Sequence, residues 1–162
     1  DRNYAPGNWS GKEFMVVDTG GLDPTNDSHI QEEINLQVDF ALEEADSIIL
    51  LCDFLDGLLP HDKEILNLLR KKCSKKPLFV VINKVDNADR SDELYDFYEL
   101  GVEKLFPISA IHGHGVADLL DEVVAPFPKP EKERLATDEL GMIAIVGRPN
   151  VGKSSLLNKI LG

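Results

Sequence analysis

The residues best suited to chemistry form a glycine-rich loop near the end of the sequence. Residues 147–154, Gly-Arg-Pro-Asn-Val-Gly-Lys-Ser, fit the pattern G-x-x-x-x-G-K-[ST] of a phosphate-binding loop. The apolar run 143–146 before it is typical of a strand, and residues 155–161 after it have helical spacing. Backbone N–H groups and the helix N-terminus are then expected to face phosphates. Lys153 adds a charge between the β- and γ-phosphates, and the Ser154 hydroxyl suits Mg²⁺.

A second polar motif follows an apolar run in the middle of the chain. Residues 78–82 are typical of a buried strand and lead directly into Asn83-Lys84-Val85-Asp86. A carboxylate at the end of such a strand can accept hydrogen bonds from both the ring N–H and the amino group of guanine. Adenine lacks that donor pair, and a site built on paired polar groups rejects the wrong partner by ~10⁴ or more. Asp86 therefore predicts guanine as the base.

Two further elements could complete such a site. Residues 14–17 form another apolar strand, which ends in Asp18-Thr-Gly-Gly21. Asp18 can reach the shell of a bound Mg²⁺, and the backbone N–H of Gly21 can approach a γ-phosphate closely. Ser109 and Ala110 follow a short apolar run and offer backbone N–H groups to the guanine oxygen.

Taken together, these motifs resemble those of the Ras-like superclass of P-loop GTPases. More narrowly, they resemble the bacterial and organellar EngA/Der family of tandem GTPases, which assist assembly of the large ribosomal subunit. The resemblance covers nearly the whole chain apart from residues near 125–141. It implies an α/β, Ras-like fold whose mostly parallel six-stranded sheet has helices on both faces, with the phosphate loop at the C-terminal end of the chain. The narrower resemblance rests on residues 147–155 (GRPNVGKSS), 18–21 (DTGG), 1–4 (DRNY), 97–101 (FYELG) and 109–115 (SAIHGHG).

The resemblance also implies the ligands and the residues that hold them. The ligands are GTP or GDP with Mg²⁺, and a K⁺ ion beside the phosphates. Ser154 and Asp18 would hold Mg²⁺, and Asn150 would help to hold K⁺ and, with Lys153, take part in catalysis. The residues implied to bind the nucleotide are Gly147, Arg148, Pro149, Asn150, Val151, Gly152, Lys153, Ser154, Ser155, Asp18, Gly21, Asn83, Lys84, Asp86, Ser109 and Ala110.

The order of the motifs along the chain allows two assemblies. Against the family layout, residues 1–124 resemble a first GTPase domain without its phosphate loop and switch I threonine. Residues 125–141 are then a linker, and residues 142–162 begin a second domain, which leaves two half-sites in different pockets. Alternatively, the second domain's loop fills the empty place in the first, within one chain or by exchange in a dimer. The linker reaches at most ~55–60 Å, which permits the route within one chain.

Catalysis is expected to be weak in this chain. Many relatives carry a glutamine directly after Asp-x-x-Gly to orient the attacking water, and Leu22 stands there instead. His29 is close in sequence, but a solvated histidine at a helix start is the favoured interpretation. A K⁺ ion beside Asn150 would neutralise developing charge, yet the switch I loop that completes such a site is missing. We therefore expect nucleotide binding with very slow hydrolysis.

The elements that must position these residues follow from hydrophobic periodicity. Helix caps are expected at Ser28 and Ser91, a helix start at Pro60 and a helix stop at Gly101. The prolines between residues 126 and 130 predict a semi-rigid, solvated linker. Strands are expected near 3–9, 13–18, 47–53, 78–83, 104–108 and 142–147, and helices near 28–44, 61–73, 91–100, 116–124 and 153–161.

Bulk properties fit a soluble, cytoplasmic protein. The 162 residues support one domain with a substantial core. No apolar run approaches the ~20 residues that span a bilayer, and the N-terminus lacks signal-peptide character, so no membrane partner is expected. Cys52 and Cys73 are expected to be free thiols rather than a disulfide.

The formal charge of −12 argues against a direct grip on nucleic acid by this chain. The basic residues between 70 and 76 are interpreted as a solvated helix end that complements the helix dipole. Contact with the large ribosomal subunit would then lie in other parts of the intact protein. The favoured function is a ribosome-assembly GTPase. The alternatives are a permuted or exchanged GDP-binding module without catalysis, and an Era-like GTPase in tRNA modification.

Overall fold

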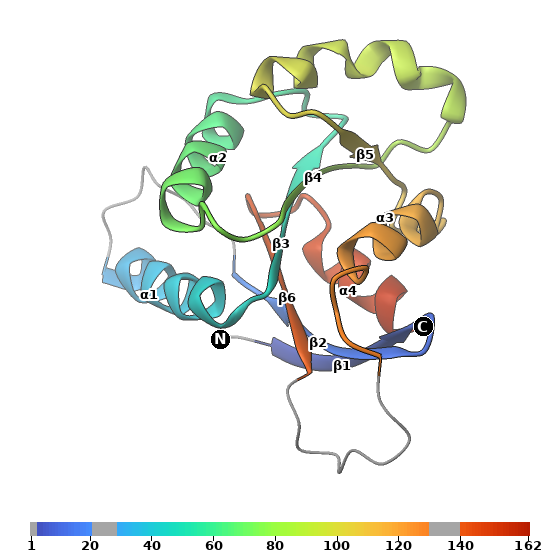
Figure 1. Ribbon diagram of the computed structural model, residues 1–162. Helices are drawn as coiled ribbons and strands as arrows, with labels where there is room; N and C mark the ends of the chain where they lie inside the picture. Colours follow the sequence, from blue (N-terminus) through green and yellow to red (C-terminus); the bar gives the residue numbers. More distant parts are fainter. Residues whose placement is uncertain (1–2, 21–28, 130–139) are drawn as a thin grey trace.

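A six-stranded, mostly parallel sheet organises the protein (Figure 1). The computed structural model describes residues 3–20, 29–129 and 140–162, with only the backbone described at 3, 29–34, 88 and 91. The strand order is β1-β2-β6-β3-β4-β5, and among the described strands only the β1–β2 pair is antiparallel. This confirms the α/β, Ras-like fold. The strands are β1 (Asn3–Trp9), β2 (Lys12–Asp18), β3 (Ser47–Asp53), β4 (Leu78–Asn83), β5 (Leu105–Pro107) and β6 (Gly141–Gly147).

The last strand of the chain lies in the middle of the sheet. β6 pairs in parallel with β2 on one side, where Val17 faces Ala144, and with β3 on the other, where Leu51 faces Gly147. β3 is buried along its whole length, which fits its continuous apolar run, because a central parallel strand is covered on both faces. The phosphate loop that follows β6 is therefore carried by the centre of the sheet.

Helices cover both faces of this sheet (Figure 1). α1 and α2 lie on one face together with η1, and α3 and α4 lie on the other. Alternate residues of the central strands supply the two cores: Ile48, Leu50 and Cys52 belong to the first, and Ile49 and Leu51 to the second. The bounds are α1 (His29–Glu44), α2 (Pro60–Lys72), η1 (Ala88–Leu100), α3 (Val116–Val123) and α4 (Lys153–Leu161).

The helix ends partly match the sequence-based expectation. Pro60 is the first residue of α2, and Gly101 ends η1 with a left-handed φ of 68°, as predicted. The cap expected at Ser91 is wrong. η1 is a 3₁₀ helix that begins three residues earlier, and the Asn87 side chain accepts a hydrogen bond from the backbone N–H of Asp89. Asn is also a favoured cap residue, so composition alone did not separate the two positions. Ser28 lies outside the described residues.

The expected linker is not solvated throughout its described part. Phe127 is only 5% exposed and its ring lies 6.4 Å from that of Phe14 on β2. Gly141, at the other end of the linker, leaves room for the same ring, because an added Cβ would lie 2.5 Å from it. An aromatic side chain among the prolines thus fastens both ends of the linker to the core.

The basic residues at the end of α2 contact neighbouring elements rather than solvent alone. Lys76 donates to the carbonyl of Glu43 at 2.7 Å, and Arg70 donates to the carbonyl of Leu100 at 3.0 Å. Both carbonyls lie at helix ends, where backbone acceptors lack partners within the helix. Lys72 pairs with Asp39 of α1 at 2.6 Å. Arg70 and Lys76 therefore satisfy carbonyls at the ends of other helices, and Lys72 pairs with a side chain within α1.

Two remaining expectations concern the cysteines and the bilayer. Cys52 and Cys73 are both buried and free, as predicted. Within the described ranges, no helix combines the length and apolarity needed to cross a membrane.

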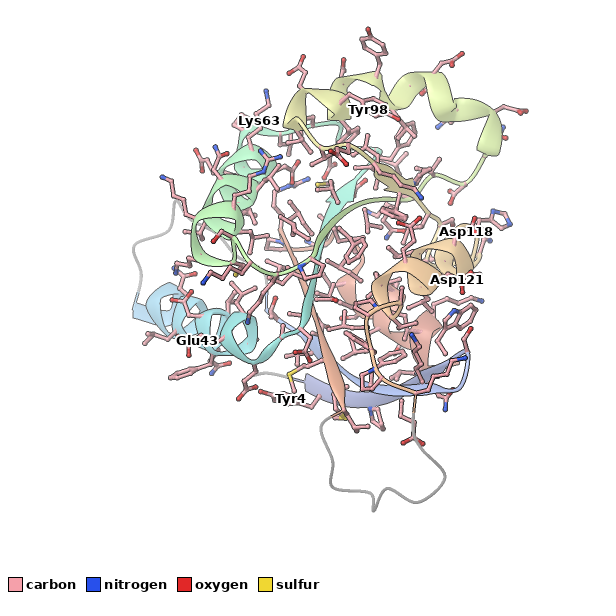
Figure 2. All side chains as sticks on the ribbon, viewed as in Figure 1. Tyr4, Glu43, Lys63, Tyr98, Asp118 and Asp121 are labelled. Atoms are coloured by element: carbon pink, nitrogen blue, oxygen red, sulfur yellow. The ribbon has the colours of Figure 1, made fainter. Side chains whose placement is uncertain are left out.

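Figure 2 shows Asp118 and Asp121 among the side chains of α3. The indole N–H of Trp9 on β1 donates to Asp121 at 2.7 Å, which links the edge of the sheet to this helix.

Candidate functional site

Polar residues gather where the central strands end. Asp18, Asp53 and Asn83 are the last residues of β2, β3 and β4, and Gly147 is the last residue of β6. Because these strands are parallel, their carboxyl ends share one edge of the sheet. Ligands of open α/β sheets bind at such an edge. The motifs from the start, middle and end of the sequence thus meet at one place in this chain.

The phosphate loop turns sharply and is held by its own lysine. Lys153 is 8% exposed, and its ammonium group donates to the carbonyl oxygens of Arg148 at 2.8 Å and Gly147 at 3.3 Å. Asn150 and Gly152 have φ values of 65° and 102°, in the left-handed region. Burial lowers the pKa of Lys153, Asp18 counteracts this by raising it, and Arg148 lowers it further. An approaching anion would replace the carbonyls as partners of this partly desolvated cation.

The start of α4 lies beside the end of β2. The Ser154 hydroxyl donates to the carboxylate of Asp18 at 3.0 Å. Next to it, Thr19 is buried and its hydroxyl donates to the carbonyl of Ile145 at 2.7 Å. A carboxylate and a hydroxyl in contact are the hard oxygen ligands that Mg²⁺ prefers, so these two side chains fit the ion. Gly21, the remaining residue of the motif, lies outside the described residues.

Asn83 joins the phosphate loop to the predicted base-binding segment. Its amide nitrogen donates to the carbonyl of Val151 at 2.9 Å, and its amide oxygen accepts from the backbone N–H of Ala110 at the same distance. Ser109 donates its hydroxyl to the carboxylate of Asp86 at 2.8 Å. One buried side chain therefore bridges the two halves of the site, and a neighbouring hydroxyl orients Asp86.

Lys84 brings in an acidic residue that sequence reasoning did not single out. Its ammonium group forms an ion pair with Asp53 and donates to the backbone carbonyl of Asn150 at 3.1 Å. Asp53 is buried, and its other oxygen accepts from the backbone N–H of Leu55 at 2.8 Å. The sequence did carry a signal, because Asp53 ends an apolar strand as Asp18 does. Lys84 is thus held over the phosphate loop by a fixed carboxylate.

The Arg148 side chain contacts acidic residues at and before the start of α2. Its Nε donates to Asp62 at 2.9 Å, and a terminal nitrogen lies 3.4 Å from Asp56. Burial alone would lower the pKa of Arg148, but the hydrogen bond and charge of Asp62, with a smaller effect from Asp56, raise it. Asp62 was also missed. Its only signal was an acidic residue in the first turn of a helix, which more often caps that helix.

The remaining predicted site residues differ in their burial. Val151 is fully buried beneath the loop, whereas Pro149 and Asn150 are exposed at its tip and Ser155 is half-buried in the first turn of α4. Leu22 lies outside the described residues, and His29 is described by its backbone alone.

Comparison with known proteins places this geometry among GTPases. A family model described as "50S ribosome-binding GTPase" matches residues 1–84 and 142–162. The GTPase Der of Acetivibrio thermocellus is 45% identical over 163 residues, a match that covers 100% of this chain but 36% of that protein. GTPase Der of Listeria innocua is likewise 45% identical over 162 residues, with the same shares covered. The chain thus spans little more than a third of the length of these relatives.

Solved structures show the same fold at lower sequence identity. An Era variant of Aquifex aeolicus bound to GDP·AlF4⁻ has a TM-score of 0.70 at 24% identity, over 86% of this chain and 48% of the other. Era in complex with MgGDPNP and a fragment of 16S ribosomal RNA has a TM-score of 0.69, also at 24% identity and with the same shares covered. At this identity, the likeness concerns the fold.

Proposed function

The chain belongs to the family of 50S ribosome-binding GTPases, and from this premise we propose that it binds guanine nucleotide at the carboxyl edge of its sheet. One observation carries the proposal: Asn83 bridges Val151 of the phosphate loop and Ala110 of the base-binding segment at 2.9 Å on each side. A phosphate site and a guanine site are useful together only when they are held at a fixed separation. The bridge provides that separation within one chain.

Each part of the site has a separate task in this proposal. Lys153 exchanges its two loop carbonyls for phosphate oxygens. Backbone N–H groups of the loop donate to the same anion. Asp86, oriented by Ser109, accepts the two guanine donors. Ser154 and Asp18 would hold Mg²⁺, and a bound Mg²⁺ would neutralise part of the phosphate charge.

The intact protein is proposed to hydrolyse GTP to GDP and phosphate, with little hydrolysis by this chain alone. Leu22 stands where many relatives carry a water-orienting glutamine. Asn150, exposed at the tip of the phosphate loop, is the residue proposed to help hold K⁺. The measurement is GTP turnover in KCl and in NaCl. K⁺-stimulated turnover near that of a full-length relative would contradict this part of the proposal.

The cellular process proposed is assembly of the large ribosomal subunit. The family description and the relatives named GTPase Der support it. A net charge of −12 makes this chain a poor ligand for RNA phosphates, so the contact is assigned to other parts of the intact protein. Co-sedimentation of a full-length relative with 50S subunits, with and without a GTP analogue, tests this step.

Two domain arrangements remain proposals. In the first, residues 1–124 form the first GTPase domain, residues 125–141 a linker, and residues 142–162 the start of the second. In the second, the chain is a permuted or exchanged GDP-binding module without catalysis. The position of β6 between β2 and β3 supports completion of the site by this segment. A monomeric mass with bound GDP would support a permuted monomer, and a dimeric mass would support exchange.

The binding experiment separates these cases. Fluorescent GDP is titrated into the 162-residue chain and into Lys153→Ala and Asp86→Asn. Loss of affinity in both variants is expected, because one removes the phosphate cation and the other the guanine acceptor. Asp86→Asn should also gain affinity for xanthosine diphosphate, because an amide can donate to the additional ring carbonyl of xanthine. GDP affinity that is insensitive to Asp86→Asn would refute the assignment of the base site.

A further inference from the structure

A buried ion pair ties the phosphate loop to the first turn of α2. The side chains of Arg148 and Asp62 are 11% and 0% exposed, and Nε of the arginine lies 2.9 Å from Oδ1 of the aspartate. The two residues are 86 positions apart in the chain. Buried ion pairs hold their geometry because separating the charges leaves one of them uncompensated.

The aspartate is itself held on the helix. Its other oxygen, Oδ2, accepts from the backbone N–H of Leu59 at 3.0 Å, so the carboxylate satisfies a backbone donor at the start of α2. Burial raises the pKa of the Cys52 thiol on β3, and the negative charge of Asp62 raises it further. Asp62 is thus buried and held at the start of α2 through Oδ2, which leaves Oδ1 for Arg148.

The backbone carbonyl of Arg148 is part of the phosphate loop. The Arg148 carbonyl oxygen accepts from the Lys153 ammonium at 2.8 Å, while its side chain is fastened to Asp62. The next turn of the loop contains Asn150 and Gly152, both in the left-handed region of backbone space. Such a conformation persists only where its surroundings hold it. If Arg148 shifts, the carbonyl that places Lys153 shifts with it.

We propose that Asp62 is a positioning residue of the nucleotide site, which acts through Arg148 to hold the phosphate loop in its ligand-receiving shape. The loop and the first turn of α2 then move as one unit. This inference rests on the proposed function for its effect on nucleotide, but the anchoring of the loop itself does not. The effect falls on the part of the ligand that the loop contacts, the β-phosphate, rather than on the base held by Asp86.

Asp62→Asn is the informative change, because it removes the charge and keeps the volume and an acceptor for Leu59. Glu99→Gln is the matched control. It breaks an exposed ion pair of α2, Lys63–Glu99, at 3.1 Å with exposed fractions of 48% and 64% (Lys63 is labelled in Figure 2). Affinities for GDP and GMP are measured by displacement of fluorescent GDP, at a temperature where each variant is fully folded by circular dichroism.

A positioning role has a specific signature. Asp62→Asn should weaken GDP at least tenfold and GMP less than twofold, whereas Glu99→Gln should change neither. The Arg148→Gln/Asp62→Asn double variant should lose no more than the worse single variant, because both changes break one contact. Equal losses for GDP and GMP, or losses that add in the double variant, would indicate a merely structural role and overturn the inference.

A second readout needs no nucleotide. Hydrogen–deuterium exchange of a peptide covering residues 147–154 should be at least tenfold faster in Asp62→Asn than in the unchanged protein, with Glu99→Gln unaffected. If the unchanged protein binds no GDP, the proposed function fails, and the exchange rate alone decides whether Asp62 anchors the loop. Unchanged exchange in Asp62→Asn would overturn the anchoring.

Discussion

Gly152→Ala tests the bridge between the phosphate loop and the base-binding segment. Gly152 has a φ of 102°, and a Cβ added there would lie 2.2 Å from the amide nitrogen of Asn83. Real Cβ contacts do not come so close, so either the loop or the Asn83 side chain must move. That side chain donates to Val151 and accepts from Ala110 at 2.9 Å each. The substitution should therefore break the bridge as well as strain the backbone.

The magnitude follows from the two effects. Left-handed backbone costs an L-residue about 1–2 kcal/mol. Each hydrogen bond lost by Asn83 adds about 1 kcal/mol, because both are buried and their partners are left unpaired. Gly101→Ala is the control, since Gly101 also has a positive φ of 68° but an added Cβ there would meet nothing within 4 Å. Gly152→Ala should thus cost about 2 kcal/mol more than Gly101→Ala.

Thermal unfolding followed by circular dichroism measures the difference. For a chain of this length, 2 kcal/mol corresponds to a midpoint about 4–8 °C lower for Gly152→Ala than for Gly101→Ala. GDP affinity should fall at least tenfold in Gly152→Ala alone, because the loop shifts against the base site. Equal midpoints for the two variants, with GDP affinity retained, would refute the account of Asn83 as the structural bridge.

Three further predictions concern single side chains. Burial lowers the pKa of Lys153 from its ordinary value of 10.5, so the ammonium should lose its proton, and the protein its GDP affinity, before that pH is reached. Lys153→Ala is the control, because its GDP affinity should be low at every pH of the titration. Burial, with a smaller effect from Asp62, raises the pKa of the Cys52 thiol above its ordinary 9.0, and the unfolded thiol ionises first. Stability should therefore be retained below pH 9.0 and fall as the pH rises above it, and Cys52→Ala should remove this fall in thermal unfolding scans. Lys76→Met removes a donor to two carbonyls at the end of α1 and should cost about 1 kcal/mol by urea unfolding, whereas Lys75→Met, at an exposed position, should cost less.

The elements that carry the site could be read from the sequence because their signals are local. The apolar runs at 47–53 and 78–83 coincide with β3 and β4, and Pro60 and Gly101 mark helix ends as expected. The run of apolar residues in a strand and the backbone preferences of proline and glycine are local properties of the sequence, so these elements could be predicted without knowledge of their tertiary contacts. The exception was Ser91, where two residues suited to a cap, Asn87 and Ser91, lie four positions apart.

Contacts between distant segments left no comparable signal. Arg148 reads as part of a phosphate motif, yet its guanidinium faces Asp62 and Asp56. Phe127 reads as part of a proline-rich linker, yet it packs on Phe14. In each case the partner lies far along the chain. The type of a residue shows which interactions it can make, but not which partner the fold places beside it.

The sequence by itself predicted the chemistry proposed for this protein and determined the order of its strands and helices. Motif spacing names phosphate, guanine and Mg²⁺ ligands because each requires particular side chains at particular separations. Whether the loop at residues 147–154 and Asp86 belong to one site was open, because connectivity permits more than one assembly. In the tertiary structure β6 pairs between β2 and β3, where its apolar residues are buried on both faces, and this pairing supports one site within one chain. Burial and strand pairing depend on the whole sheet, so only the folded chain shows that Asn83 reaches Val151.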